Sequence, residues 1–223
     1  MAQMSTGPDQ RPPAGAGQRV DAARNRQRIL DAARALYAVD GLGVSMAAVA
    51  REAGVGKATL SRHFATPGEL VEAVFTEHMR AYATATEEAL AVEDPWEGFT
   101  AYVTRVCQMQ AEDRGFASVL TLTFSGAEEL EQLRVRAYQG FLSIIERARA
   151  TGHLREDFAS EDLILVLIAN AAVVEATAAA APDAWRRLAG HLLRGFATPG
   201  APLPPVPPAP TSADLYEVMV RNT

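Results

Sequence analysis

The chain alternates between stretches of helix-like apolar periodicity and short breaks rich in glycine, proline and acidic residues. Within each stretch the apolar residues recur at intervals of three and four, which is the spacing that lines one face of an α-helix. No stretch shows sustained strand alternation between hairpin turns. Alanine is abundant, whereas aromatic residues make up only 7% of the chain. The pattern therefore predicts an all-α protein.

The most informative stretch is 45–64, SMAAVAREAGVGKATLSRHF. Ser45 can cap a helix by accepting a backbone N–H bond, and apolar residues follow it at i, i+3, i+4 and i+7. Gly54 allows the left-handed backbone conformation that ends a helix. A second helix then starts after the turn and carries an apolar pair four residues apart, Leu60 and Phe64. The stretch predicts two short helices joined by a tight turn.

Two helices joined in this way are typical of the DNA-binding helix-turn-helix, whose second helix lies in the major groove. Its outward side chains are short, polar or basic, so the helix can approach base edges and phosphates. The predicted DNA-binding residues are Ser45, Lys57, Ala58, Thr59, Ser61, Arg62 and His63. We expect Thr59 and Ala58 to contact bases, and the three basic residues to contact phosphates. An ordinary helical hairpin with a solvated polar face has the same spacing.

Residues 24–75 resemble the N-terminal domain of TetR-type transcriptional regulators. The matching segments, in the family's order and spacing, are RQRILDAARALYAVDG at 26–41, VAREAGVGKATLSRHF at 49–64 and GELVEAVF at 68–75. Two positions depart from the family pattern, because Ser61 stands where the family usually has tyrosine and Gly68 where it often has lysine. Both family residues tend to hold phosphates. The departures therefore predict fewer contacts with the DNA backbone or an altered operator.

The resemblance implies a ligand-released repressor that binds a palindromic operator as a homodimer, and the apolar residues of the C-terminal helices indicate an apolar or amphipathic small molecule as effector. It also implies that the fourth helix transmits ligand binding to the DNA-binding heads, and that the last two main helices form the dimer interface. An activator is equally compatible, because the sign of regulation depends on where the operator lies. The alternative from another class is a helical small-molecule-binding or interaction module with weak or lost operator recognition.

The charge distribution divides the chain, whose net charge is −6. Residues 19–80 hold nine basic against seven acidic residues, whereas residues 81–200 hold ten against seventeen. An acidic remainder repels DNA, so the nucleic-acid face is expected in the N-terminal third. The expected organisation is a disordered arm (1–20), a three-helix helix-turn-helix DNA-binding domain (22–82), a helical ligand-binding and dimerisation domain (83–197), and a proline-rich spacer with a C-terminal tail (198–223).

The remaining helices are expected at about 21–39, 68–90, 116–124, 127–150 and 163–181, with two more opening at Pro95 and Pro182. The helix at 163–181 is long enough to suggest a membrane span. Asn170 and Glu175 interrupt it, however, and charged residues at a bilayer centre are costly. A helix that is apolar on all sides is more simply buried in protein.

A cavity between the C-terminal helices would suit a small molecule. The residues expected to line it are Phe99, Tyr102, Val106, Met109, Phe116, Leu120, Phe124, Tyr138, Phe141, Ile145, Ile168 and Asn170. Each apolar member could equally fill the core. Asn170 and Glu175 need a partner, which a ligand, a neighbouring helix or a second subunit could provide. The expected dimer interface comprises Leu163, Leu167, Val174, Trp185, Leu188, Leu192 and Phe196.

Other kinds of chemistry are not indicated. The four histidines are scattered and show no zinc-ligand spacing, and phosphate-loop, dinucleotide and nucleophile-elbow motifs are missing. We therefore expect no metal, no cofactor and no enzymatic activity. Cys107 is the single cysteine, and the N-terminus lacks a basic region followed by an apolar run. Both features lead us to expect a cytoplasmic protein without membrane association.

Overall fold

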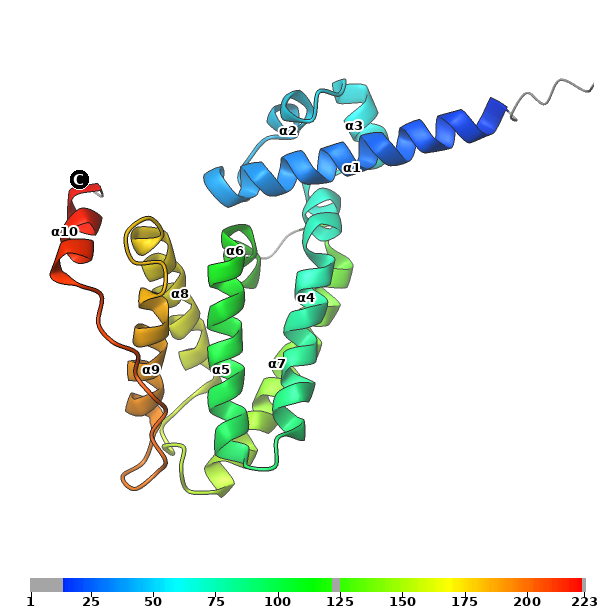
Figure 1. The fold of residues 1–223 in the computed structure, drawn as a ribbon. Coiled ribbons are helices and arrows are strands. Elements are labelled where there is room, and N and C mark those ends of the chain that lie inside the picture. Colours follow the sequence, from blue (N-terminus) through cyan, green and yellow to red (C-terminus); the bar gives the residue numbers. More distant parts are fainter. Residues whose placement is uncertain (1–13, 122–124, 222–223) are drawn as a thin grey trace, which may run out of the picture.

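The computed structural model describes residues 14–121 and 125–221, and within these ranges every regular element is an α-helix (Figure 1). The all-α prediction is therefore confirmed. The helices are α1 (Ala14–Asp40), α2 (Met46–Glu52), α3 (Lys57–His63), α4 (Pro67–Ala91), α5 (Pro95–Glu112), α6 (Arg114–Thr121), α7 (Glu128–Ala150), α8 (Ser160–Thr177), α9 (Ala184–Phe196) and α10 (Ser212–Arg221).

Helices α1 to α3 form a head that lies across one end of the remaining helices (Figure 1). Ile29 and Ala33 on α1 are fully buried and form the floor beneath α2 and α3. The α2–α3 turn follows the sequence prediction, since the Ser45 hydroxyl accepts a hydrogen bond from Ala48 N at 3.2 Å. Gly54 adopts a φ of +61°, the left-handed conformation that ends α2 without strain.

Helix α4 links the head to the body. It begins with a reciprocal cap: the Thr66 hydroxyl accepts from Glu69 N at 3.2 Å, and the Glu69 carboxylate accepts from Ala65 N at 2.8 Å. Pro67 occupies the first turn, where its missing N–H costs no helical bond. The helix then runs along the body and packs mainly against α7 and α5 (Figure 1).

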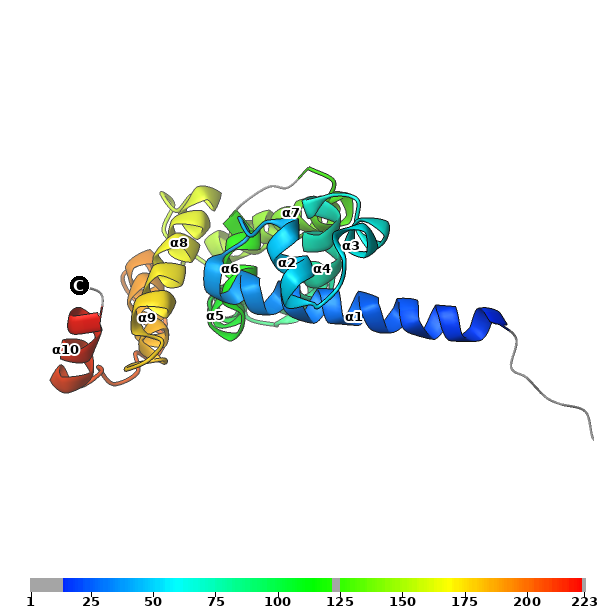
Figure 2. The same cartoon turned by 90° about the horizontal axis from the view of Figure 1, so that it is seen from above.

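The body consists of α4 to α7, with α8 and α9 packed against α5 as an outer layer (Figures 1 and 2). Its centre is an aromatic cluster in which the Tyr102 and Phe141 rings stack at 5.2 Å, and the Phe99 and Phe158 rings meet edge-on at 5.2 Å. Among the described helices, none combines the length and apolarity needed to cross a membrane.

Three sequence predictions need correction at their boundaries. A disordered arm is expected from the sequence over 1–20, but residues 14–20 are helical and belong to α1. Once a helix has formed, each further residue adds a backbone hydrogen bond, so the helix can extend into residues that are weaker helix formers. Residues 1–13 lie outside the described part. Helix α8 runs over Ser160–Thr177 rather than over 163–181, and at its start the Asp162 carboxylate accepts from Ala159 N at 2.8 Å. Helix α9 begins at Ala184 rather than at Pro182.

Candidate nucleic-acid interface and effector cavity

Helix α3 has one buried and one open side. Leu60 and Phe64 are buried in the head, as the apolar pair predicted. All seven predicted DNA-binding residues lie at the open surface of α2 and α3: Thr59 and His63 are half-buried, and the exposed ones are Ser45, Lys57, Ala58, Ser61 and Arg62. Figure 1 shows α2 and α3 on the side of α1 that faces away from the body. The structure therefore brings the predicted residues together on one accessible surface.

Two arginines of α1 hold the turn and the end of α3 in place. Arg28 Nη2 donates to the Gly54 carbonyl at 3.2 Å, and the Arg26 guanidinium lies 5.3 Å from the centroid of the Phe64 ring. Arg26 is exposed beside the candidate DNA-binding surface, so it adds positive charge there. The place of Arg26 beside Phe64 depends on how α1 packs, so no local pattern in the sequence indicates it.

The departure at Gly68 has a structural reason. A Cβ atom at this buried position would overlap the Ser125 carbonyl oxygen and lie 3.1 Å from the Gly126 carbonyl carbon. Just beyond this contact, Glu129 N donates to the Glu72 carboxylate at 2.7 Å. The segment that leads into α7 therefore lies directly on the first turn of α4. A lysine side chain could not extend from this position toward DNA.

Comparison with known proteins identifies the family. Residues 29–74 match the family model described as bacterial regulatory proteins, tetR family, and residues 94–198 match the one described as transcriptional regulator SbtR-like, C-terminal domain. The chain belongs to the TetR family. It is thus a DNA-binding transcriptional regulator with an N-terminal helix-turn-helix domain and a helical C-terminal domain. The members of this family are transcriptional regulators, which are generally not enzymes. The described residues of this TetR-family chain hold no cluster of metal-ligating side chains.

Solved structures agree with this fold. PfmR from Thermus thermophilus is 23% identical, with 76% of this chain and 94% of PfmR covered and a TM-score of 0.54. FadR from Bacillus subtilis, solved in complex with stearoyl-CoA, is 19% identical, with 77% and 97% covered and a TM-score of 0.55. At these identities the likeness shows the fold alone. No curated protein sequence matches the chain.

A cavity of about 440 Å³ opens between α4, α6, α7 and α8 of this TetR-family regulator. Its lining is mostly apolar, with Arg134 and two glutamates as charged members. The lining residues are Tyr82, Leu120, Glu131, Arg134, Val135, Tyr138, Phe141, Ser160, Glu161, Leu163, Ile164 and Leu167. Of the predicted pocket residues, the structure places Leu120, Tyr138 and Phe141 here.

Most other predicted pocket residues lie in the packed core outside this lining. They are Phe99, Tyr102, Val106, Met109, Phe116 and Ile145, all of them buried. All six belong to one hydrophobic core, and burial raises the pKa of the Tyr102 hydroxyl well above its usual value. Phe124 lies outside the described residues. Sequence periodicity identifies which residues face inward, but it does not distinguish a cavity wall from a filled core.

Asn170 and Glu175 find their partners on neighbouring helices. The Asn170 amide nitrogen donates to the Cys107 carbonyl at 3.1 Å and to Gln110 Oε1 at 2.9 Å, which ties α8 to α5. Glu175 is exposed and pairs with Arg114 at 3.1 Å. The Asn170 nitrogen thus has partners without a ligand, whereas Asn170 Oδ1 and Gln110 Nε2 are buried with no hydrogen-bond partner among the described residues. Asn170 does not line the 440 Å³ cavity.

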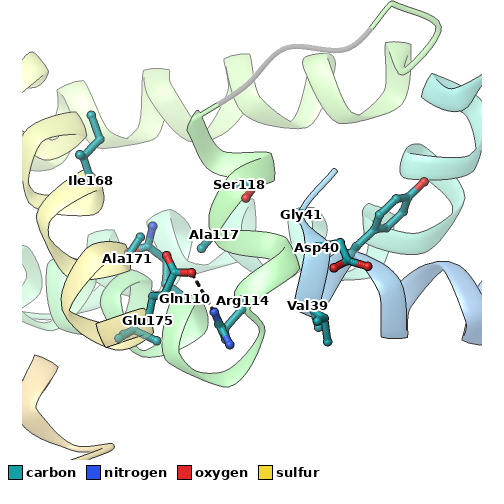
Figure 3. Close-up of a pocket in the computed structure, with 13 residues that line it drawn as sticks. Val39, Asp40, Gly41, Gln110, Arg114, Ala117, Ser118, Ile168, Ala171 and Glu175 are labelled. Carbon is teal, nitrogen blue, oxygen red and sulfur yellow. Dashed lines mark hydrogen bonds and ion pairs between the residues drawn. The ribbon is translucent and has the colours of Figure 1, made fainter. Parts of the chain in front are cut away.

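A second hollow of about 390 Å³ lies between the end of α1 and the helices α5, α6 and α8 (Figure 3). Figure 3 shows the Arg114–Glu175 ion pair on one side and Val39 to Gly41 on the other. Ile168, predicted for the ligand pocket, lines this hollow instead. Tyr37 also lines it, and burial raises the pKa of its hydroxyl to about 12.

The predicted dimer residues face inward more than expected. Leu163, Leu167, Val174 and Trp185 are buried in their own chain, and the half-buried ones are Leu188, Leu192 and Phe196. The large apolar residues exposed on α8 are Ile164, Leu165 and Ile168. Because α8 is apolar on nearly all sides, its periodicity could not distinguish the face that packs on α5 from the face left open.

Cys107 is expected to be inert toward thiol reagents in the folded protein. It is fully buried, and burial raises the pKa of its thiol to about 12, so the reactive thiolate is scarce at neutral pH. Ellman's reagent at pH 8 should label the cysteine only after denaturant is added. Rapid labelling of the native protein would contradict the packing of α5 described above.

Proposed function

We propose that this chain is a repressor that binds a palindromic operator as a homodimer and is released by a small-molecule effector. The observation that carries the proposal is the open face of α3, where Lys57, Ala58 and Arg62 are exposed while Leu60 is buried beneath them. A helix held in this way can enter a major groove, and two heads related by a dimer axis read two half-sites. A cytoplasmic location follows from this function.

Ala58 and Thr59 near the start of α3 are the proposed base contacts, because their short side chains let the backbone approach base edges. Lys57, Arg62 and His63 are the proposed phosphate contacts, and Ser45 and Ser61 complete the surface. Phosphate contacts supply affinity without sequence information, whereas the two short residues would set which bases are accepted.

Arg62→Ala is expected to weaken binding to all DNA sequences alike and to lower the slope of log K against log salt by about one. The physical reason is the loss of one phosphate contact and of its released counterion. The measurement is fluorescence-anisotropy titration of specific and random duplexes at several salt concentrations. An unchanged slope would remove Arg62 from the phosphate-binding set.

The effector is proposed to bind in the 440 Å³ cavity between α4, α6, α7 and α8. This volume lies within the range of small-molecule sites, and its apolar walls with a few polar groups suit an amphipathic molecule. FadR from Bacillus subtilis has the same fold, and its structure contains stearoyl-CoA. That neighbour supports an apolar or amphipathic effector class but does not identify the molecule.

The signal is proposed to pass from the cavity to α4 through the start of α7. Leu120 on α6 and Glu131 on α7 line the cavity, and between them in sequence lies Ser125, which touches Gly68 in the first turn of α4. An effector that favours another spacing of α6 and α7 would therefore shift the base of the head. It needs only a differential affinity of a few kcal/mol for the DNA-incompetent state.

The dimer is proposed to form through the outer layer of α8 and α9. Ile164, Leu165 and Ile168 on α8 are exposed large apolar residues of the kind that mark interaction surfaces. A two-fold axis would bring this layer of one copy against the same layer of the other copy. Arg186 and Arg194 are exposed on α9 and add positive charge to the layer. The half-buried residues of the predicted set, such as Leu192, would contribute at the edge.

A second candidate function is that of a ligand-binding module that uses the cavity but does not recognise an operator. Ser61 lacks the ring of the family tyrosine, and the covered Gly68 cannot carry the family lysine, so both usual phosphate contacts are missing. A helical ligand-binding module of this kind would bind DNA only weakly, and physiological salt would erase that binding. Competition with random DNA separates it from the repressor.

A further inference from the structure

The C-terminal helix α10 has little to pack against in its own chain. Most of its ten residues are exposed, including Leu215 at 42%, Tyr216 at 64% and Val220 at 58%. An isolated helix shorter than about 12–15 residues is marginal in water, because few hydrogen bonds offset its nucleation cost. A helix of this length with an exposed apolar side therefore needs a surface on which to bury it.

The start of α10 is built as a helix start. Thr211 N donates to the Asp214 carboxylate at 2.9 Å, and Asp214 N donates to the Thr211 hydroxyl at 3.2 Å. This reciprocal pair is the capping box, which satisfies backbone N–H groups that the first turn leaves unpaired. The cap fixes where the helix begins, but it does not cover Tyr216 or Val220.

The proline-rich segment before α10 is fixed to the body. Three proline carbonyls accept side-chain hydrogen bonds: Pro202 from Trp96 Nε1 at 2.8 Å, Pro204 from Arg194 Nε at 2.9 Å and Pro207 from Arg187 Nη1 at 2.6 Å. Proline-rich chain is stiff, so this path sets where the chain leaves α9. Only residues 208–210 separate the last anchored carbonyl from the cap of α10.

The anchored segment delivers α10 to the outer layer of the molecule. Both views show α10 on the side of α8 and α9 that faces away from α5 and α7 (Figures 1 and 2). It touches α8 there. Leu165 on α8 is exposed at 64%, whereas Ile164 and Ile168, also exposed, line the 440 Å³ cavity and the 390 Å³ hollow. Helix α10 thus lies beside the layer of α8 and α9 through which the proposed dimer would form.

We propose that α10 is an arm that packs its apolar side on a second copy of this chain, extending the dimer interface beyond α8 and α9. The inference rests on the dimer of the proposed function. A second copy is the occupant that fits, because α10 adjoins the dimer layer and two-fold symmetry places two arms on two equivalent surfaces at once. Tyr216 and Val220, four residues apart on one helical side, are its central contacts.

The test compares dimer dissociation of four proteins by sedimentation velocity over a wide concentration range. They are the full chain, a chain ending at Pro210, the double variant Tyr216→Ser with Val220→Ser, and the control Glu217→Gln, an exposed polar change on the same helix. We expect the dissociation constant to rise about tenfold or more in the truncated chain and in the double variant, and to stay unchanged in the control.

Each outcome has a distinct meaning. A full chain that stays monomeric at all concentrations would overturn both the dimer and the arm. A full-length dimer whose dissociation constant is unaffected by truncation would overturn the arm alone. Truncation that lowers the unfolding temperature without changing dissociation would show that α10 packs within its own chain, which also contradicts the proposal.

Discussion

Gly68→Lys is expected to destabilise the protein, although it restores the residue that the family often has at this position. The new Cβ would overlap the Ser125 carbonyl oxygen, so the segment leading into α7 must move or the first turn of α4 must open. Overpacking of this kind typically costs about 1–3 kcal/mol. The unfolding temperature should therefore fall by roughly 2–12 °C in a thermal melt.

Ser61→Tyr serves as the matched comparison, because it restores the other family residue at an exposed position on α3. We expect this variant to keep its unfolding temperature and to bind DNA more tightly, through one added phosphate contact. Gly68→Lys that melts like the parent chain and binds DNA more tightly would contradict the contact between Gly68 and Ser125.

Ala58→Glu is expected to abolish operator recognition while leaving the fold intact. Ala58 is exposed near the start of α3, where a carboxylate suits the helix dipole but would face the phosphates and acceptor atoms of DNA. The longer side chain would keep α3 away from the base edges, and its charge would repel the phosphates. We therefore expect the affinity for the operator to fall by about 100-fold or more. Anisotropy titration measures the loss, and circular dichroism checks the fold.

Ala101→Glu is the control for net charge. Ala101 is exposed on α5 in the body, and the substitution adds the same charge to the chain. Its DNA affinity should equal that of the parent protein. Equal losses in the two variants would mean that overall charge, rather than the face of α3, controls binding, and would argue against the proposed reading surface.

The head could be predicted almost completely from the sequence, because its signals are local. Ser45, Gly54 and the Leu60–Phe64 pair determine a cap, a turn and a buried side within a few residues of one another. The side of α3 that faces outward then follows from the period of the helix. The sequence did not indicate the contact of Arg26 with Phe64, because this contact depends on the packing of α1.

The helices of the body could be predicted from the sequence, but the residues that line its cavity could not. Phe99 and Tyr138 have similar sequence signals, yet Phe99 is fully buried in the aromatic cluster and Tyr138 lines the cavity at 49% exposure. The difference arises from how the helices pack against one another, which no local pattern encodes. Gly68 shows the same limit, since its meaning depends on Ser125 far along the chain.

The central claim is that α3 reads a specific operator. The most direct measurement is fluorescence-anisotropy binding of the full chain to duplexes from around its own gene, at two salt concentrations and against excess random DNA. We predict tight binding that survives the competitor, with one dimer per palindrome. Binding that collapses with salt and competitor alike would contradict the account and favour the ligand-binding module without operator recognition.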